Sequence, residues 1–370
     1  MEKSTNWVEI DLTVVKSNVE YVLRKTQTPL MAVVKANAYG HGALRLLPVL
    51  VEAGVHWLGV AHCSEALALR AAGCKLPILV FGPTLDGEEI RVAIEKDVTL
   101  TLPGPEYAPV YSQAARATGG SLAVHLKIDT GMGRLGVLPE EALALAQCAR
   151  SEGGISLTGI YSHFAVVDEE FNHPLTKLQL ERFTATLQLL EKDGFRFEWV
   201  HCSNSGSLET LPASYFNLGR CGSTIYGLMP TFFQPYPEAI RPALTWKARL
   251  VSCKKLPQGW AVGYGQEYLA DGKETIGVVA VGYADGFRRA KHNRLLVGGK
   301  IVPVVGRVNM DYCMVSLDEP LPAGTEVVII GSQGIKSLIA QDHANDWGTI
   351  DADVTAQINA RVPRIYLNDR

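Results

Sequence analysis

The chain has 370 residues, 47% of them hydrophobic and 20% charged, so it can bury a large core and has room for a large and a smaller domain. Its 35 basic and 38 acidic residues nearly cancel and form no long run of one sign, which argues against a nucleic-acid surface or a polybasic membrane-binding face. No stretch of about 18 uncharged apolar residues is present, and the charged start of the chain lacks the apolar segment of a secretory leader, so we expect a cytoplasmic protein.

Short apolar runs alternate with amphipathic segments in the first part of the chain, a pattern typical of parallel strands joined by helices. The predicted strands are 30–35, 56–61, 76–82, 98–102, 123–129, 157–164, 199–203 and 216–227. The predicted helices between them include 43–53, 64–72 (with Ser64 as N-cap), 140–151 and 176–193. Eight β/α repeats in about 200 residues indicate a TIM barrel. A doubly wound open sheet is the alternative, but the turn after the first strand lacks the glycine-rich phosphate fingerprint of that fold.

From about residue 240 the chain is rich in β-type runs separated by Gly, Pro and Asp turns. The predicted strands are 244–256, 275–281, 295–299, 301–305 and 326–330. We therefore expect an α/β protein: a TIM-barrel domain over residues 11–235, then a mainly antiparallel β domain formed by residues 1–10 and 236–370. The Pro-containing stretch 229–242 is the predicted linker.

Lys35 closes the first apolar run, where a barrel places catalytic groups. Burying an unpaired ammonium costs several kcal/mol, roughly, so a lysine at this position is unusual in a purely structural role. A lysine whose amine reaches solvent at the strand end is the simpler alternative. A desolvated lysine with a lowered pKa is also what Schiff-base chemistry requires.

The loops after the seventh and eighth predicted strands are rich in Ser and Gly. They read Ser-Asn-Ser-Gly at 203–206 and Arg-Cys-Gly-Ser at 220–223. Small residues let backbone N–H groups approach phosphate oxygens, and barrels often bind phosphate at these two loops. Ordinary turns can have the same Ser- and Gly-rich sequence. The position of the two clusters, after the seventh and eighth strands, favours a phosphorylated ligand.

Neither the seven cysteines nor the nine histidines form a metal-binding or disulfide pattern. Reduced, mostly buried thiols are expected, with Cys202 and Cys221 beside candidate site residues. No metal is predicted.

Several long motifs resemble those of the alanine racemase family. They are AVVKANAYGHG at 32–42, KIDTGMGRLG at 127–136, VGYADG at 281–286, GRVNMD at 306–311 and RVPR at 361–364. These independently placed motifs extend the resemblance over essentially the whole chain. The family interconverts L- and D-alanine with pyridoxal 5′-phosphate (PLP), supplies D-alanine for peptidoglycan, and forms homodimers with composite active sites.

The resemblance implies that Lys35 holds PLP covalently and that Arg220 faces the pyridine nitrogen. Guanidinium keeps its protons, so this nitrogen stays unprotonated and the ring becomes a weaker electron sink, which favours racemisation over transamination. The implied cofactor-binding residues are Lys35, Tyr39, Asn204, Ser205, Arg220, Gly222 and Ser223.

Racemisation needs two acid/base groups on opposite faces of the substrate Cα. The resemblance implies Lys35 and Tyr264 for these roles, with His163 assisting Tyr264 and Arg220 orienting His163. Taken alone, a tyrosine or histidine at these positions would more often be an ordinary packed residue. The implied substrate-binding residues are Arg134, Met310, Lys127 and Tyr283. Tyr264 and Met310 would come from the second subunit, and Lys127 matches a lysine that is carbamylated in many relatives.

One position departs from the family pattern. Relatives usually carry a tyrosine directly before Arg-Val-Pro-Arg, where this chain has Ala360, preceded by Asn359. A lost aromatic wall changes discrimination by only about 1–3 kcal/mol, so a serine or broad-specificity racemase is an alternative. A PLP-dependent decarboxylase would share Lys35 but would pair the pyridine nitrogen with an acidic residue. A non-catalytic PLP carrier would have no need of the Tyr264 segment.

Overall fold

The computed structural model describes residues 4–167, 170, 172–228 and 237–369 and divides into two compact units. One unit consists of Val15–Ala38 and Ala43–Ile240, and the other of Met1–Val14, Tyr39–Gly42 and Arg241–Arg370. The domain boundary predicted between residues 235 and 236, and most of the predicted linker, lie outside the described residues.

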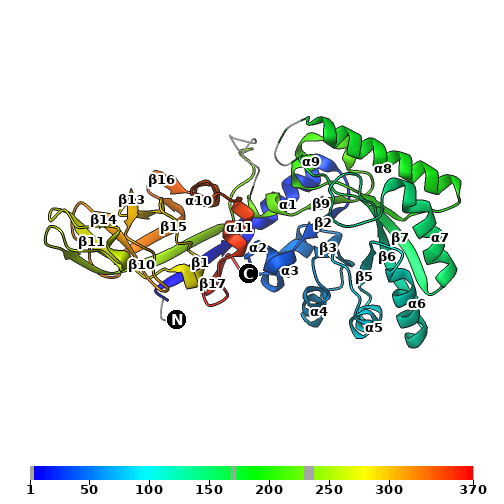
Figure 1. The fold of residues 1–370 in the computed structure, drawn as a ribbon, viewed down its shortest axis with the longest axis horizontal. Coiled ribbons are helices and arrows are strands. Elements are labelled where there is room, and N and C mark those ends of the chain that lie inside the picture. Colours follow the sequence, from blue (N-terminus) through cyan, green and yellow to red (C-terminus); the bar gives the residue numbers. More distant parts are fainter. Residues whose placement is uncertain (1–3, 168–169, 171, 229–236, 370) are drawn as a thin grey trace. The chain divides into compact units, whose positions relative to one another are not determined.

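The first unit contains eight parallel strands in the order β8-β7-β6-β5-β4-β3-β2-β9. This arrangement confirms the predicted TIM-barrel class (Figure 1). The strands are β2 (Leu30–Val33), β3 (Trp57–Val60), β4 (Ile78–Val80), β5 (Thr99–Leu102), β6 (Leu122–Lys127), β7 (Ile155–Tyr161), β8 (Trp199–His201) and β9 (Gly219–Cys221). Most are shorter than predicted. Every residue of β2, β3, β4 and β5 is buried, as expected for strands covered on both faces.

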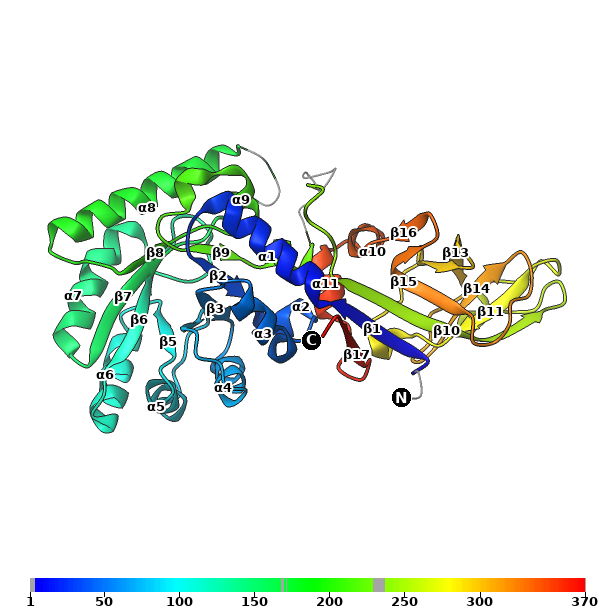
Figure 2. The ribbon, with the colours of Figure 1, turned by 180° about the vertical axis from the view of Figure 1, so that it is seen from behind.

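Helices follow the strands, and Figures 1 and 2 both show α4 to α8 around the outer side of the strands. The helices are α1 (Leu12–Thr26), α2 (Lys35–Tyr39), α3 (Ala43–Glu52), α4 (Cys63–Ala71), α5 (Gly87–Glu95), α6 (Tyr107–Thr118), α7 (Ala142–Glu152), α8 (Pro174–Lys192) and α9 (Ser205–Thr210), with 3-10 turns η1 (Pro139–Glu141), η2 (Pro212–Ser214) and η3 (Ser223–Tyr226). The predicted N-cap Ser64 is wrong, because α4 begins after His62, whose backbone N–H donates to Glu65.

The seam between β8 and β9 is joined by a side chain. Asn217 precedes β9; its Oδ1 accepts from the backbone N–H of Val200 at 2.7 Å, and its Nδ2 donates to the carbonyl of Glu198 at 2.7 Å. The amide thus replaces a peptide group of a neighbouring strand in the hydrogen-bond ladder.

The second unit is built on a nine-stranded sheet in the order β16-β15-β12-β13-β14-β11-β10-β1-β17, with a further pairing of β15 to β10. Among the described residues all pairings of this sheet are antiparallel except β1 with β17, which confirms the mainly antiparallel prediction. The elements are β1 (Asn6–Asp11), β10 (Leu244–Lys255), η5 (Tyr264–Gln266), β11 (Thr275–Val279), η6 (Tyr283–Asp285), β12 (Arg294–Val297), β13 (Lys300–Val305), β14 (Cys313–Leu317), β15 (Glu326–Gln333), β16 (Lys336–Leu338), α10 (Ala340–Trp347), α11 (Asp351–Ala356) and β17 (Arg364–Leu367).

Within the described ranges, the helices are all too short or too polar to cross a membrane.

Candidate active site

A left-handed turn follows β2 directly and carries Lys35 at its start. The backbone angles are φ 51°, ψ 49° at Ala36, φ 53°, ψ 46° at Asn37 and φ 56°, ψ 53° at Ala38. Residues with a Cβ pay roughly 1–2 kcal/mol each for this conformation. Such strain persists only where the surroundings enforce it, and it concentrates at functional sites.

Two side chains hold the turn in place. The Glu65 carboxylate accepts from the backbone N–H of Ala36 at 2.7 Å and from that of Ala61 at 2.8 Å, so it ties the turn to the loop after β3. Asn37 Oδ1 accepts from the N–H of Ala43, the first residue of α3, at 3.0 Å. The strained backbone is therefore fixed from both sides.

The Lys35 amine is less basic than an ordinary lysine. Burial lowers its pKa, the positive charge of Arg134 lowers it further, and the Glu65 carboxylate opposes the shift only in part. A lysine of this kind has a larger neutral fraction at a given pH, and the neutral amine is the nucleophile in Schiff-base formation.

Arg220 lies in β9 and is only 3% exposed. Its Nη1 donates to His201 Nδ1 at 2.7 Å, and its Nη2 lies 3.1 Å from His163 Nδ1 and donates to the carbonyls of Ser162 and Cys202. Burial lowers its pKa to about 10, so the guanidinium is still a cation near neutral pH. In the described part of the chain no hydrogen bond uses the Arg220 Nε–H, so this donor of a buried cation is available to a ligand.

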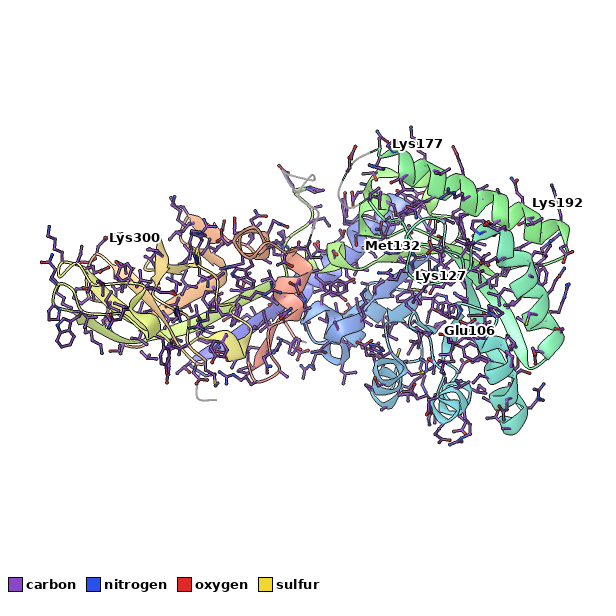
Figure 3. All side chains as sticks on the ribbon, in the orientation of Figure 1. Glu106, Lys127, Met132, Lys177, Lys192 and Lys300 are labelled. Atoms are coloured by element: carbon purple, nitrogen blue, oxygen red, sulfur yellow. The ribbon has the colours of Figure 1, made fainter. Side chains whose placement is uncertain are left out.

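Lys127 is the last residue of β6 and is buried, whereas Lys177 and Lys192 on α8 are exposed (Figure 3). Its Nζ lies 4.8 Å from the centre of the Tyr161 ring and donates to the carbonyl of Ile128 at 3.3 Å. Burial, followed by the charge of Arg220, lowers its pKa to about 7. The surroundings thus disfavour a third cation close to Arg220 and Arg134.

The loop that carries Arg134 is organised by one carboxylate. Asp129 Oδ1 accepts from the backbone N–H groups of Gly131, Met132 and Gly133, and Oδ2 accepts from that of Arg134 at 3.0 Å. Burial raises the pKa of Asp129, but the four N–H donors outweigh burial and leave the pKa below its ordinary value. The ionised carboxylate holds the loop, and the Arg134 side chain is exposed.

Two helical turns begin next to each other after β8 and β9. Asn204 caps α9 by accepting from the N–H of Ser207 at 3.1 Å, and Ser205 is the first residue of that helix. Gly222 precedes η3, which begins at Ser223, and its N–H donates to Ser205 Oγ at 3.1 Å. Hydroxyls and backbone N–H groups at the start of helical turns form a cradle suited to a phosphate.

Three of the predicted residues belong to the β-rich unit, where they lie on exposed turns. Tyr264 is 68% exposed, Met310 is 53% exposed and Tyr283 is 45% exposed. Tyr283 and Met310 are neighbours, because the N–H of Tyr283 donates to the carbonyl of Asn309 and the N–H of Ala284 donates to that of Met310. Exposed neighbours such as Tyr283 and Met310 are candidates for a surface that a partner covers, because contiguous apolar patches mark such surfaces.

Tyr39 also groups with the β-rich unit and ends the left-handed segment with φ 54°. The next residue, Gly40, accepts a hydrogen bond from Arg364 Nε at 3.3 Å, and Arg364 Nη1 donates to the carbonyl of Asn359 at 2.6 Å. Arg364 thus joins the segment after Tyr39 to the turn that contains Ala360, whose side chain is exposed.

Several residues of the site were not predicted from the sequence: Glu65, Asp129 and the buried histidines His125 and His201. His125, Lys127 and Asp129 occupy alternate positions of the apolar run 123–129, and all three are buried. Polar residues at every second position of such a run are the pattern from which this part of the site could have been found.

Two family models match this chain: "Alanine racemase, N-terminal domain" over residues 10–230 and "Alanine racemase, C-terminal domain" over residues 243–366. An alanine racemase of Geobacillus kaustophilus is 41% identical over 372 residues, which cover 98% of this chain and 95% of the relative. One of Symbiobacterium thermophilum is 39% identical over 365 residues, with 97% and 96% covered.

Solved structures agree with the sequence matches. The alanine racemase of Bacillus anthracis with bound L-Ala-P has a TM-score of 0.95 at 35% identity, covering 100% of this chain and 97% of its own. That of a D-cycloserine-producing Streptomyces lavendulae has a TM-score of 0.94 at 39% identity, covering 100% and 98%. With both family models, the full-length relatives and the barrel site in agreement, this chain belongs to the alanine racemase family.

Proposed function

We propose that the protein interconverts L- and D-alanine with PLP and thereby supplies D-alanine for peptidoglycan. The observation that carries the proposal is the pairing of β2 with β9, which places Met31 opposite Arg220. Strand β2, which leads to Lys35 with its lowered pKa, therefore lies beside β9, which holds the buried Arg220. The Nε–H of Arg220 has no hydrogen-bond partner among the described residues. The matches to alanine racemases support the choice of reaction. The cytoplasmic location stays a prediction.

The residues of the barrel fit PLP. Lys35 offers the amine for the covalent link, Ser205, Gly222 and Ser223 offer the phosphate cradle, and the unpaired Nε–H of Arg220 offers a donor to the pyridine nitrogen. When bound, PLP supplies an electron sink that acidifies the Cα proton of an amino acid. The guanidinium keeps its own proton, so Arg220 limits the strength of that sink.

Two groups would move the proton at Cα. Lys35 serves one face, since its lowered pKa lets the amine accept and return a proton. Tyr264 of the partner subunit serves the other face in a homodimer with composite sites, which agrees with its exposure in the single chain. His163 accepts from Arg220 through Nδ1, so its Nε2–H is left to support the Tyr264 oxygen when the phenol has lost its proton.

The substrate carboxylate needs positive or N–H donors. Arg134 supplies a guanidinium on a loop that Asp129 holds in place. The partner's Met310 supplies its backbone N–H, and Tyr283 lies beside Met310. Lys127 would act as a carbamate, because its neutral amine can combine with CO₂ and release a proton to solvent, and the charges of Arg134 and Arg220 would stabilise the resulting anion.

Ala360 supports a second candidate, a racemase that also accepts serine. It is a small, exposed residue in the turn that Arg364 joins to the segment after Tyr39, and it has no ring that could narrow a substrate pocket. The decarboxylase alternative receives no support, because Arg220, not a carboxylate, offers the donor to the pyridine nitrogen.

A panel of L-amino acids in deuterated water tests the proposal. We expect loss of optical activity and deuterium at Cα of alanine without CO₂ release, and residual activity with serine. The Ala360→Tyr variant should lower the serine-to-alanine ratio of kcat/KM by about tenfold or more. Tyr264→Phe should retain the cofactor absorbance and lose turnover. CO₂ release would contradict the assignment as a racemase. An unchanged serine-to-alanine ratio in Ala360→Tyr would contradict the role of Ala360 in accepting serine.

A further inference from the structure

A chain of buried histidines ends on Arg220. His125 lies in β6 and His201 in β8, and both are fully buried. His125 Nδ1 is 2.8 Å from His201 Nε2, and His201 Nδ1 is 2.7 Å from Arg220 Nη1. His201 also stacks on Tyr161, with 4.9 Å between ring centres and 8° between planes. Four strands of the barrel, β6 to β9, are thus connected through side chains.

The direction of each hydrogen bond in this chain follows from Arg220. A guanidinium has donors and no acceptor, so His201 Nδ1 must be the unprotonated nitrogen. Burial, followed by the charge of Arg220, lowers the pKa of His201 well below its ordinary value, so the ring is neutral and carries its proton on Nε2. His201 Nε2–H therefore donates to His125 Nδ1, and His125, also neutral, carries its proton on Nε2.

The Nε2–H of His125 has no hydrogen-bond partner among the described residues. A buried, unpaired donor costs about 1–3 kcal/mol. The ring also requires glycine at position 159 on β7, because a Cβ there would lie 2.5 Å from His125 Cδ2 and 2.6 Å from Nε2. An apolar residue would fill the space without the unpaired N–H, so packing alone does not account for a histidine here.

We propose that His125 is a positioning residue for Arg220, an inference that rests on the proposed function. As an acceptor, it stabilises the same Nε2–H form of His201 that the bond to Arg220 requires, with the Nδ1 lone pair toward the guanidinium. Without it, His201 could carry its proton on Nδ1 or rotate, and the bond to Nη1 would be lost. The remaining bonds of Arg220 run through Nη2, so the orientation of the Nε–H depends on His201 and, through it, on His125.

The test compares two substitutions at His125. Asn can place its Oδ1 near the position of Nδ1 and keep the acceptor, whereas Leu removes it. In His125→Leu we expect kcat for alanine to fall roughly tenfold with little change in KM, as for a lost hydrogen bond to a charged group. In His125→Asn most of kcat should return. His343→Leu, which removes another buried histidine in the β-rich unit, is the control and should leave kcat unchanged.

A spectroscopic measurement makes the test independent of turnover. Selective ¹⁵N-histidine labelling of the holoenzyme distinguishes protonated from unprotonated ring nitrogens, and His201→Asn assigns the signals of His201. We expect an Nε2–H tautomer in the wild type and in His125→Asn, and an altered pattern in His125→Leu. An unchanged His201 pattern in His125→Leu overturns the inference, even if no amino acid is racemised and the proposed function itself fails.

Gly159→Ala provides a second route if His125→Leu does not fold. It displaces the His125 ring and keeps every hydrogen-bonding group, so the His201 signals should change as in His125→Leu. Gly87→Ala is the matched control, because a Cβ at Gly87 meets no atom within 4 Å. Normal His201 signals in a folded Gly159→Ala protein would contradict the inference.

Discussion

At the scale of single residues, buried charge determines which groups can act in this barrel. Lys35, Lys127 and Arg220 all have lowered pKa values because they are buried near one another or near Arg134. The consequences differ: Arg220 remains a cation, while Lys127 loses its proton near neutral pH. A set of side chains that would all be positive in water is thus divided into charged and neutral members.

The Lys127 amine should make stability depend on pH. Its pKa is about 7 in the folded protein against an ordinary value of 10.5, so the unfolded chain binds more protons between these values. The free energy of unfolding contributed by this group therefore rises as pH increases above about 7. In CO₂-free buffer, the wild-type Tm should rise relative to that of Lys127→Met between about pH 7 and about pH 9.

Bicarbonate supplies the control for this experiment. Carbamylation of the folded protein releases a proton (R–NH₂ + CO₂ → R–NHCOO⁻ + H⁺), and unfolding takes a proton up again when CO₂ is lost. Added bicarbonate should therefore extend the rise of Tm with pH to values below about 7 and add the mass of one CO₂ to the native wild type. Lys127→Met should show neither effect. Parallel Tm curves for the two proteins in CO₂-free buffer would show that the amine is not desolvated as described.

At the scale of elements, the left-handed turn of Ala36, Asn37 and Ala38 illustrates how tertiary contacts override local preference. Alanine favours a right-handed helix, so nothing in these residues alone predicts the turn. Two contacts from outside it, Glu65 to Ala36 and Asn37 to Ala43, hold it. The turn sets the direction in which the chain leaves Lys35.

Replacing Ala36 should reveal the strain. Ala36 is exposed, so Ala36→Gly removes only the steric cost of the left-handed conformation and should raise the free energy of unfolding by up to about 1 kcal/mol. Ala36→Val should lower it. Denaturant unfolding measures both. Ala32→Gly in buried β2 is the control and should be destabilised. A destabilised Ala36→Gly protein would show that the turn carries no strain.

The strands of the barrel could be predicted from the sequence, because strands covered on both faces read as continuous apolar runs. In the β-rich unit the prediction missed β14, β16 and β17 and both helices, α10 and α11. These elements are short, and α10 and α11 contain several Asp residues, so local patterns are weak there. The Lys35 and Arg220 positions followed from motifs. The pairing of His125 with His201 depends instead on the strand order β6-β7-β8, and that of His201 with Arg220 on barrel closure, and no local pattern encodes either.

At the scale of the whole molecule, the composite site predicts that two inactive variants can restore each other. In the proposed head-to-tail homodimer, Lys35 of one subunit would act with Tyr264 of its partner. Lys35→Ala and Tyr264→Phe should each be inactive alone. After unfolding and refolding together, about half of the dimers are mixed, and each has one intact site of two, so about a quarter of the wild-type activity should return.

Sedimentation should show dimers for both variants and for the refolded mixture. As a control, Lys35→Ala refolded with Arg220→Met, whose defect lies in the same barrel as Lys35, should regain no activity, because every site then contains one defective barrel. Activity in the single variants, or none in the Lys35→Ala and Tyr264→Phe mixture, would contradict composite sites.

The bridging amide of Asn217 joins the seam of the barrel at the point where His201 and Arg220 face each other from adjoining strands. One side chain therefore contributes both to the closure of the scaffold and to the spacing of the hydrogen bond that we propose positions Arg220. In homologous barrels with another residue at this position, other contacts must hold that spacing. Substitution of Asn217 should lower turnover before it prevents folding.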